Sequence, residues 1–274
     1  VQSLSQFLEK FNIPLLSGID TRALTQFIRS NGSTPGKIVT KAAENKLPFY
    51  DPNKKNLVAE VGVKEPKIYN NGNKNIIVLD CGVKNNTLRN FLKRGLTVIR
   101  VPWNYDFFEN PVLDKTGKPY QIDGLFISNG PGDPAMLNEP IQIIKKAIKK
   151  QMPIFGICLG NQLMAIAAGA KTYKMKFGNR GQNQPCLNTE NNKCYITSQN
   201  HGFSVIEEEV RKSKNVEITH VNLNDITIEG IRVKDRVAFS VQYHPESAPG
   251  PHDSTYLFDD FIGAIQTVSS PELK

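Results

Sequence analysis

The sequence predicts an α/β protein: a doubly wound, mostly parallel sheet preceded by the C-terminal piece of a smaller α+β domain. After residue 75, short apolar segments alternate with amphipathic helical segments. The apolar segments are continuous, as is typical of parallel strands that are buried on both faces. The polar, aperiodic segment 70–75 (NNGNKN) separates this region from a shorter first part, and it predicts a linker.

The first part of the chain, residues 1–69, predicts one clear helix at Thr21–Ser30. Asp20 is placed to cap this helix and Gly32 to end it. The apolar stripe of the helix consists of Ala23, Leu24, Phe27 and Ile28. A part of about 70 residues with one helix is short for an independent core. We therefore interpret it as the tail end of a domain that is larger than these 69 residues.

The second part alternates strands and helices. The expected strands are Ile76–Leu79, Leu96–Val101, Gly124–Ser128, Pro153–Ile157, Cys194–Ser198, Gly230–Val233 and Val237–Tyr243. The expected helices cover Asn86–Lys93, Ile141–Lys150, Gln162–Ala168 and Tyr256–Thr267. Strand–helix alternation of this kind is typical of an open sheet with helices on both faces.

Composition excludes several classes of function. The hydrophobic content of 39% and the charged content of 22% are typical of a globular chain, and no apolar run approaches the ~18 residues of a membrane span. The net charge of +8 does not predict nucleic-acid binding, because the lysines are scattered. The densest group, Lys145, Lys146, Lys149 and Lys150, has the pattern of a solvated helix face.

Cysteine and histidine usage indicates neither a disulfide framework nor a metal site. The four cysteines, Cys81, Cys158, Cys186 and Cys194, show no CxxC spacing. The four histidines are dispersed, and none pairs at ligand spacing. We expect a reducing compartment and no bound metal.

The segment Gly156-Ile157-Cys158-Leu159-Gly160 carries the strongest chemical signal. A nucleophile flanked by glycines, between a buried strand and a helix, is the pattern of a nucleophile elbow. It places Cys158 at a helix N-terminus, where backbone N–H groups favour the reactive thiolate. Read alone, the segment is also compatible with a buried structural cysteine.

A second segment, His244-Pro245-Glu246, follows the strand Val237–Tyr243. Residues i and i+2 of an extended segment point to the same side. His244 is therefore a candidate general base for Cys158, and Glu246 a candidate to orient the imidazole. Alone, a histidine at a strand end is more often structural.

A third segment, the turn Gly130-Pro131-Gly132, follows the strand Gly124–Ser128. Loops after parallel strands meet at one edge of the sheet, so this turn can offer a backbone N–H to an oxyanion. Pro131 has no N–H, and the N–H of Leu159 is the natural second donor.

Taken together, these residues resemble the triad-type (class I) glutamine amidotransferase family, whose fold is flavodoxin-like. Further segments resemble the glutaminase portion of carbamoyl-phosphate synthetase. They are GIDTRALT (18–25), DCGVK (80–84) with Asn86 and Arg89, VPW (101–103), GNRGQNQP (178–185), QNHGF (199–203) and QYHPESAPGPHD (242–253).

The resemblance implies a role for each matching residue. Cys158 would attack the glutamine amide and form a glutamyl thioester, His244 would move the proton, and Glu246 would support His244. The residues that would contact glutamine or its oxyanion are Gly130, Gly132, Leu159, Gln162, Asn200, Gly202 and Phe203. We interpret His201, His220, His252, Cys81, Cys186 and Cys194 as structural or surface residues.

The chain departs from the family in two ways. Asn161 stands where most active members have histidine, as in an ammonia-dependent branch whose glutaminase has lost its cysteine. The family's glutaminase portion also begins with further residues, including part of the glutamine site, so we expect a fragment or a piece of a fused protein. The resemblance implies the C-terminal part of a small-subunit N-terminal domain at 1–69, a linker at 70–75, a glutaminase domain at 76–268 and a tail at 269–274.

The resemblance leaves alternatives open. The first is an active glutaminase that delivers ammonia to a carbamoyl-phosphate synthetase large subunit or fused synthetase domain. The second is a catalytically weak or inactive module that binds and regulates the synthetase. A sibling amidotransferase of another pathway and a glutamyl-peptide hydrolase fit less well. No cofactor is expected in this chain, since ATP and Mg²⁺ would be used by the partner. We expect pyrimidine or arginine biosynthesis, and a cytoplasmic location with a mitochondrial one as the alternative.

Overall fold

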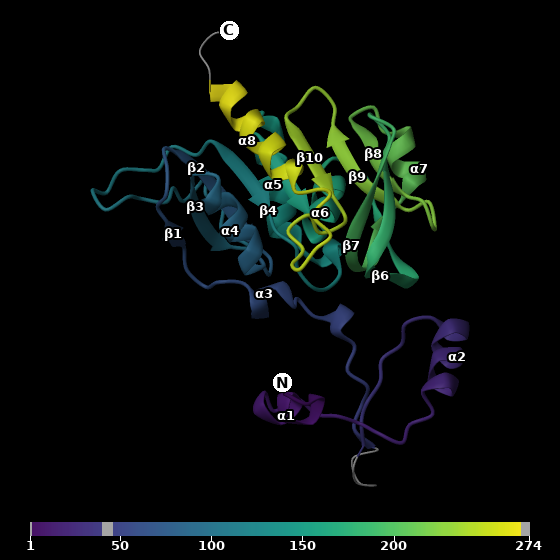
Figure 1. Ribbon diagram of the computed structural model, residues 1–274. Coiled ribbons are helices and arrows are strands. Elements are labelled where there is room, and N and C mark those ends of the chain that lie inside the picture. Colours follow the sequence, from purple (N-terminus) through teal and green to yellow (C-terminus); the bar gives the residue numbers. More distant parts are fainter. Residues whose placement is uncertain (1, 40–45, 270–274) are drawn as a thin grey trace. The chain divides into compact units, whose positions relative to one another are not determined.

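The computed structural model describes residues 2–39 and 46–269 (Figure 1). The chain forms two compact units, Val1–Tyr50 and Asp51–Lys274. The expected tail 269–274 lies, beyond Ser269, outside the described residues.

The first unit contains the helices α1 (Leu4–Lys10) and α2 (Thr21–Asn31). The helix predicted at Thr21–Ser30 is confirmed, and the Asp20 carboxylate caps it by accepting a 2.9 Å hydrogen bond from the N–H of Ala23. Neither helix buries a residue. The first unit therefore has no apolar core formed by its described helices.

The second unit carries the remaining elements. Its helices are η2 (Pro52–Lys54), α3 (Val58–Val61), α4 (Asn85–Lys93), η3 (Pro134–Met136), α5 (Asn138–Lys149), α6 (Leu159–Ala167), α7 (Glu207–Lys212) and α8 (Tyr256–Ser269). Its strands are β1 (Lys67–Tyr69), β2 (Lys74–Asp80), β3 (Leu96–Pro102), β4 (Gly124–Ile127), β5 (Ile154–Ile157), β6 (Thr172–Asn188), β7 (Lys193–Val205), β8 (Val216–Asn222), β9 (Ile228–Val233) and β10 (Ala238–Val241).

All ten strands form one sheet in the order β1-β3-β2-β4-β5-β10-β9-β8-β6-β7. The strands β3, β2, β4, β5 and β10 are parallel to one another. The remaining pairings are antiparallel, with β1 on one side and β9, β8, β6 and β7 on the other. The predicted α/β fold is confirmed. The antiparallel strands β1, β6 and β8 were not predicted.

Helices cover both faces of the parallel strands (Figure 1). Ile77 and Leu79 of β2 pack in one buried cluster with residues of α5 and α6. Their neighbours Ile76 and Val78 pack in a second cluster with Phe91 of α4 and with α8. Because alternate residues of a strand point to opposite faces, this division produces the expected doubly wound arrangement.

The polar segment 70–75, which we expected to be a linker, lies within the second unit and connects β1 to β2. Lys74 and Asn75 already belong to β2. The backbone N–H groups of Asn71 and Gly72 lie 3.1 and 3.2 Å from the hydroxyl of Thr97, to which they donate hydrogen bonds. A Cβ on Gly72 would lie 1.7 Å from the carbonyl oxygen of Gly95. Gly72 is therefore required by close packing against Gly95, just before β3. Composition alone had indicated a flexible connection.

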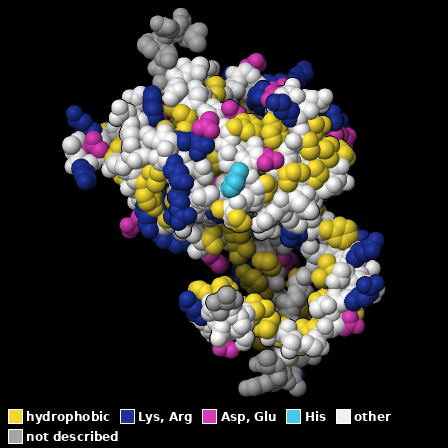
Figure 2. Space-filling model, viewed as in Figure 1, with side chains coloured by type: hydrophobic (Ala, Val, Ile, Leu, Met, Phe, Trp, Pro, Cys, Tyr) yellow, Lys and Arg dark blue, Asp and Glu magenta, His cyan; other side chains and the backbone are white. Residues whose placement is uncertain are grey.

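Basic and acidic side chains occur together on the face shown in Figure 2. Among residues 2–39 and 46–269, no helix combines the length and apolar character needed to span a bilayer.

Candidate active site

The three predicted chemical segments meet at one edge of the sheet. The strands β4, β5 and β10 are parallel, so the loops that follow them leave the sheet on the same side. The β4 loop carries Gly130 and Gly132, β5 leads directly into Cys158, and β10 leads to His244. The carboxyl edge of a parallel sheet is where open α/β folds bind ligands.

Cys158 adopts the strained backbone of a nucleophile elbow. It is the N-cap of α6, with φ 55° and ψ −101°. Its N–H donates a 2.8 Å hydrogen bond to the carbonyl oxygen of Val241 on β10. A Cβ on Gly160 would lie 2.3 Å from the carbonyl oxygen of Ile127, and one on Gly156 would lie 2.9 Å from Gly160. Both glycines are therefore required by the close approach of α6 to β4 and β5.

His244 and Glu246 form a buried pair beside the thiol. His244 Nδ1 donates a hydrogen bond to Glu246 Oε1 over 2.7 Å, and the two side chains are 4% and 0% exposed. The backbone N–H of His244 donates a hydrogen bond to the carbonyl oxygen of Ser198 on β7. This bond fixes the backbone that carries the imidazole. With Nδ1 engaged by the carboxylate, Nε2 remains to face a substrate or the thiol.

The charges of this group support a thiolate–imidazolium pair. Burial opposes ionisation of Cys158, but the charge of His244 and its hydrogen bond outweigh burial and lower the pKa of the thiol. Burial likewise opposes charge on His244, yet Cys158 and Glu246 raise its pKa to about 10. Burial alone would raise the pKa of Glu246. The positive charges of His244 and Lys84 outweigh this effect, so the pKa of Glu246 is lowered. The thiolate is the nucleophilic form of cysteine, so these shifts suit nucleophilic catalysis.

Lys84 is a member of this cluster that sequence analysis did not identify as a site residue. Its Nζ lies 3.2 Å from Glu246 Oε1 and 3.2 Å from His244 Nδ1. Lys84 therefore helps to keep Glu246 ionised, although 47% of its own side chain is exposed. Asn86 adds a 2.6 Å hydrogen bond from Nδ2 to the carbonyl oxygen of Glu246, which fixes the backbone at this position.

A cavity of about 200 Å³ opens beside Cys158. Most of the predicted substrate contacts line it, together with residues that were not predicted; the lining residues are Asn53, Gly130, Pro131, Gly132, Cys158, Gln162, Arg180, Asn200, His201, Gly202 and Phe203. Leu159 is the exception, since its side chain is buried in the core. Its backbone N–H belongs to the first turn of α6, where N–H groups have no intrahelical acceptor.

Gln162 and His201 are fixed by hydrogen bonds around the carbonyl oxygen of Phe203. Gln162 Nε2 donates to this oxygen over 2.9 Å and to Gln242 Oε1 over 3.0 Å. His201 Nδ1 lies 2.9 Å from the same carbonyl oxygen, and its Nε2 lies 3.5 Å from the buried carboxylate of Glu229. His201, which we interpreted as structural, is therefore a lining residue whose orientation depends on β7 and β9.

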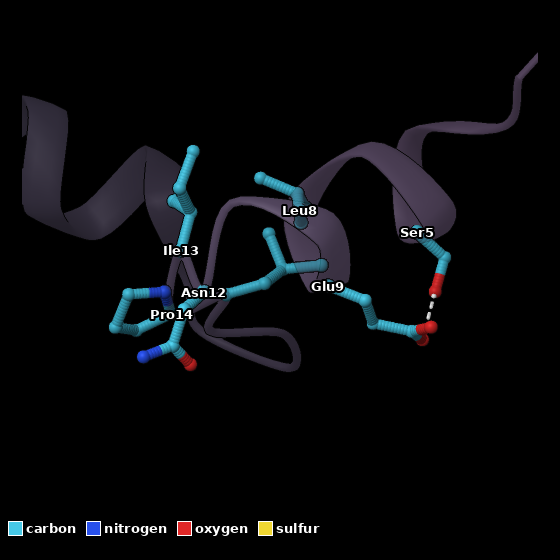
Figure 3. A pocket seen from close by; sticks show the side chains of 7 residues that line it. Ser5, Leu8, Glu9, Asn12, Ile13 and Pro14 are labelled. Atoms are coloured by element: carbon cyan, nitrogen blue, oxygen red, sulfur yellow. Dashed lines mark hydrogen bonds between the residues drawn. The ribbon is translucent and has the colours of Figure 1, made fainter.

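Other cavities occur in the described part of the chain. One of about 470 Å³ is next to Lys84 and Glu246 and shares Arg180 and Asn200 with the cavity beside Cys158. Another, of about 330 Å³, lies in the first unit (Figure 3), where Ser5 Oγ donates to Glu9 Oε1 over 3.0 Å. Within the described part of the chain, no three His, Cys, Asp or Glu side chains are grouped as metal ligands.

Comparison with known proteins identifies the family. The family model described as "Glutamine amidotransferase class-I" matches residues 77–264, which is most of the chain. The chain belongs to the class-I glutamine amidotransferase family. A second family model, "Carbamoyl-phosphate synthase small chain, CPSase domain", matches residues 1–38 of this amidotransferase.

Individual relatives show which members of the family the amidotransferase is similar to. It is 45% identical to "Carbamoyl phosphate synthase small chain" of Methanocaldococcus jannaschii, over 95% of this chain and 74% of that protein. It is 48% identical over 98% of its length to "Multifunctional protein CAD" of Squalus acanthias, of which it covers 12%. It is 43% identical over 97% of its length to "Carbamoyl-phosphate synthase [ammonia], mitochondrial" of Homo sapiens, of which it covers 17%. The amidotransferase is thus similar to a carbamoyl-phosphate synthase small chain over most of its own length, and it spans a small share of its fused relatives.

A solved structure supports the fold alone. A protein from Thermoplasma acidophilum, described as a candidate component of GMP synthase, has a TM-score of 0.57 and 22% identity to the amidotransferase. The match covers 71% of this chain and 95% of that protein.

Asn161, the residue that departs from the family pattern, does not line the cavity beside Cys158. It is fully buried, and its Oδ1 accepts a 2.8 Å hydrogen bond from the hydroxyl of Ser240 on β10. Its Nδ2 lies 3.3 Å from Gln242 Oε1. Asn161 therefore acts as a polar core residue between α6 and β10.

Proposed function

We propose that this chain hydrolyses L-glutamine to glutamate and ammonia through Cys158, His244 and Glu246. The observation that carries the proposal is the His244–Glu246 pair, joined at 2.7 Å, beside a cysteine that caps α6 with positive φ. This arrangement has the parts of nucleophilic catalysis: a nucleophile, a base and a group that orients the base.

In the first half of the reaction, the Cys158 thiolate attacks the side-chain amide carbon of glutamine. The oxygen of that amide becomes an oxyanion, for which the N–H of Leu159 and a backbone N–H of the Gly130–Gly132 turn are suitable donors. His244 gives a proton to the amide nitrogen, the carbon–nitrogen bond breaks, and ammonia leaves. The product on the enzyme is a glutamyl thioester.

In the second half, His244 is neutral and takes a proton from water. The resulting hydroxide attacks the thioester carbon, the carbon–sulfur bond breaks, and glutamate is released. The Cys158 thiolate and the His244 imidazolium are thereby regenerated. Glu246 keeps the imidazole in one orientation throughout and stabilises its charged form. No metal or organic cofactor enters these steps, and ATP and Mg²⁺ are assigned to the partner.

The partner we propose is a carbamoyl-phosphate synthetase, either as a large subunit or as a fused domain that receives the ammonia. The relatives support it, since both small chains and multifunctional proteins match this chain over most of its length. Of the two pathways we expected, we propose pyrimidine supply because multifunctional proteins are among the relatives, and arginine supply is the alternative. A cytoplasmic location remains our proposal, and the relative named as mitochondrial makes that compartment the alternative.

The experiment is to measure ammonia and glutamate release from L-glutamine, with and without the partner synthetase, for the wild type and Cys158→Ala. We expect activity in the wild type and its loss in the variant. A Cys158→Ser variant is expected to lose thioester formation while keeping the fold, as judged by thermal unfolding. Ammonia release that survives either substitution contradicts the mechanism.

The second candidate function is a module that binds and regulates the synthetase without hydrolysing glutamine. Asn161 is the observation that favours it. A wild-type chain that stays inactive in the full-length protein, while still changing the synthetase rate, is the outcome that supports this candidate.

A further inference from the structure

The proposed substrate carries a charge that the triad does not neutralise. Glutamine has an α-carboxylate at the end opposite its reacting amide, and this group stays negative throughout the reaction. A charge that enters a partly closed cavity needs a paired opposite charge or several hydrogen bonds. The cavity beside Cys158 must therefore supply a cation or a set of donors at the end remote from the thiol.

Arg180 is the one Lys or Arg side chain among the described residues that line this cavity. It lies on β6, directly opposite Asn200 of β7. The pairing of β6 with β7 is irregular on both sides of Arg180, between Lys174 and Asn179 and between Gly181 and Gln184. Irregular pairing changes the direction in which strand side chains point, which is why such positions occur beside active sites.

Two glycines make room for the guanidinium of Arg180. A Cβ on Gly178 would lie 2.7 Å from Nη1, and a Cβ on Gly202 would lie 3.4 Å from Nη2. The guanidinium therefore lies over the backbone of both strands, next to two of the predicted substrate contacts, Asn200 and Gly202. A Cβ on Gly178 would also lie 2.2 Å from the carbonyl oxygen of His201, so this glycine is required by the close approach of the two strands as well.

The guanidinium is held in place but has no acidic partner in the described part of the chain. Nη1 donates a hydrogen bond to the carbonyl oxygen of Phe177. The described ion pairs include none with Arg180, whereas Lys84 is paired with Glu246. A guanidinium has five N–H donors, and a planar pair of them matches a carboxylate. Arg180 is exposed, and one hydrogen bond orients its guanidinium while its other donors remain available.

We propose that Arg180 binds the α-carboxylate of glutamine, and so restricts this site to amino acids with a free α-carboxylate. This inference rests on the proposed glutaminase function and names the group that selects its substrate. Asn200 and Gly202, on the opposite strand, would flank the same carboxylate. Amides and peptides formed at the glutamine carboxyl group would lack the charge that Arg180 recognises.

The test uses two electrophilic glutamine analogues that alkylate a thiol with loss of N₂. They are 6-diazo-5-oxo-L-norleucine, which has the α-carboxylate, and its α-carboxamide, which does not. The rate of Cys158 alkylation is measured for the wild type, Arg180→Met and Lys176→Met by mass spectrometry of the peptide that contains Cys158, which separates it from the exposed thiol of Cys194. Lys176 lies on the same strand outside the cavity, so its variant controls for the loss of one positive charge.

We expect the wild type and Lys176→Met to favour the carboxylate analogue by about 10- to 100-fold, the range of a charge-assisted hydrogen bond. In Arg180→Met the two analogues should alkylate Cys158 at rates within about threefold of each other. The KM for L-glutamine should rise by the same factor by which this preference falls. Alkylation by iodoacetamide, which has no carboxylate, should be equal in all three proteins and shows that the thiol is intact.

An Arg180→Met variant that keeps the preference overturns the inference. A wild type that hydrolyses glutamine but reacts equally with both analogues also overturns it, and leaves the proposed function standing. A wild type that neither hydrolyses glutamine nor reacts with either analogue overturns both.

Discussion

At the scale of single residues, the chemistry depends on which groups stabilise the charge of Cys158. Burial alone would favour the neutral thiol, and His244 reverses that preference. The reversal is possible because Glu246, itself kept ionised by His244 and Lys84, stabilises the imidazolium. The thiolate form of Cys158 thus depends on three side chains from two loops: Lys84 follows β2, and His244 and Glu246 follow β10.

The pH dependence of Cys158 alkylation tests this relation. Because the pKa of the thiol is lowered, the wild type should keep reacting with iodoacetamide as the pH falls below the ordinary thiol range of ~8.5. In His244→Asn the burial effect is no longer opposed by the imidazolium, so the midpoint of the pH–rate curve should move to higher pH. Equal midpoints in the two proteins would show that His244 does not stabilise the thiolate.

Asn161 gives a second prediction at this scale, on stability. Replacing Asn161 by Leu removes the acceptor of the buried Ser240 hydroxyl, which should cost about 1–3 kcal/mol in the free energy of unfolding. Adding Ser240→Ala should recover most of that loss, because no buried polar group is then left without a partner. Denaturant unfolding of the two single variants and the double variant measures the coupling, and additive effects would contradict the hydrogen bond.

The residues that sequence analysis found, and those it missed, differ in where their signal lies. Cys158, His244 and Glu246 occur in local patterns, an elbow and a strand end, that can be read along the chain. Lys84 and Arg180 look like solvated charges in the sequence. Glu246, the partner of Lys84, lies far along the chain in the loop after β10, and Asn200, which pairs with Arg180 in the sheet, lies on β7. Only the folded sheet brings them to the same edge.

At the scale of elements, the elbow requires α6 to begin almost in contact with β4. Gly160→Ala would place a Cβ 2.3 Å from the carbonyl oxygen of Ile127. We expect a loss of about 1–3 kcal/mol in the free energy of unfolding, as for other overpacked positions, together with slower alkylation of Cys158.

Gly263→Ala is the matched control for this substitution. Gly263 lies within α8, and a Cβ there would have no atom within 4 Å. Alanine is a better helix former than glycine, so this variant should be more stable by about 0.5–1 kcal/mol. If both variants lose stability equally, the close approach of α6 to β4 is not the reason for Gly160.

The elements that sequence analysis missed are those without a strong apolar pattern. The parallel strands have continuous apolar residues and were found, as were α2, α4, α5, α6 and α8. The long strand β6 contains GNRGQNQP, a composition that is typical of loops, and irregular pairing interrupts its alternation. Its strand structure depends on pairing with β7 and β8, which is a property of the sheet and not of the segment.

At the scale of the whole chain, the two units differ in how much they bury. The helices α1 and α2 bury no residue. The second unit has two apolar clusters on opposite faces of its sheet, one of which contains Phe91, Phe126, Phe155, Phe258 and Phe261 in ring contact. The assignment of residues 1–69 and 76–268 to separate family domains stays a prediction, since the compact units divide between Tyr50 and Asp51.

This difference predicts how two fragments behave. A fragment of residues 1–50 should show no cooperative thermal transition. The reason is that its described helices bury no residue, and a chain of that length needs a buried core to offset its conformational entropy. A fragment of residues 51–274 should unfold cooperatively and should keep alkylation of Cys158 by 6-diazo-5-oxo-L-norleucine within about threefold of the whole chain. The reason is that every residue of the triad and of its cavity, from Asn53 to Glu246, lies within this fragment. Circular dichroism on heating and intact mass measure the two properties. Cooperative unfolding of 1–50, or loss of alkylation in a folded 51–274, would show that the first unit contributes a core or a site residue of its own.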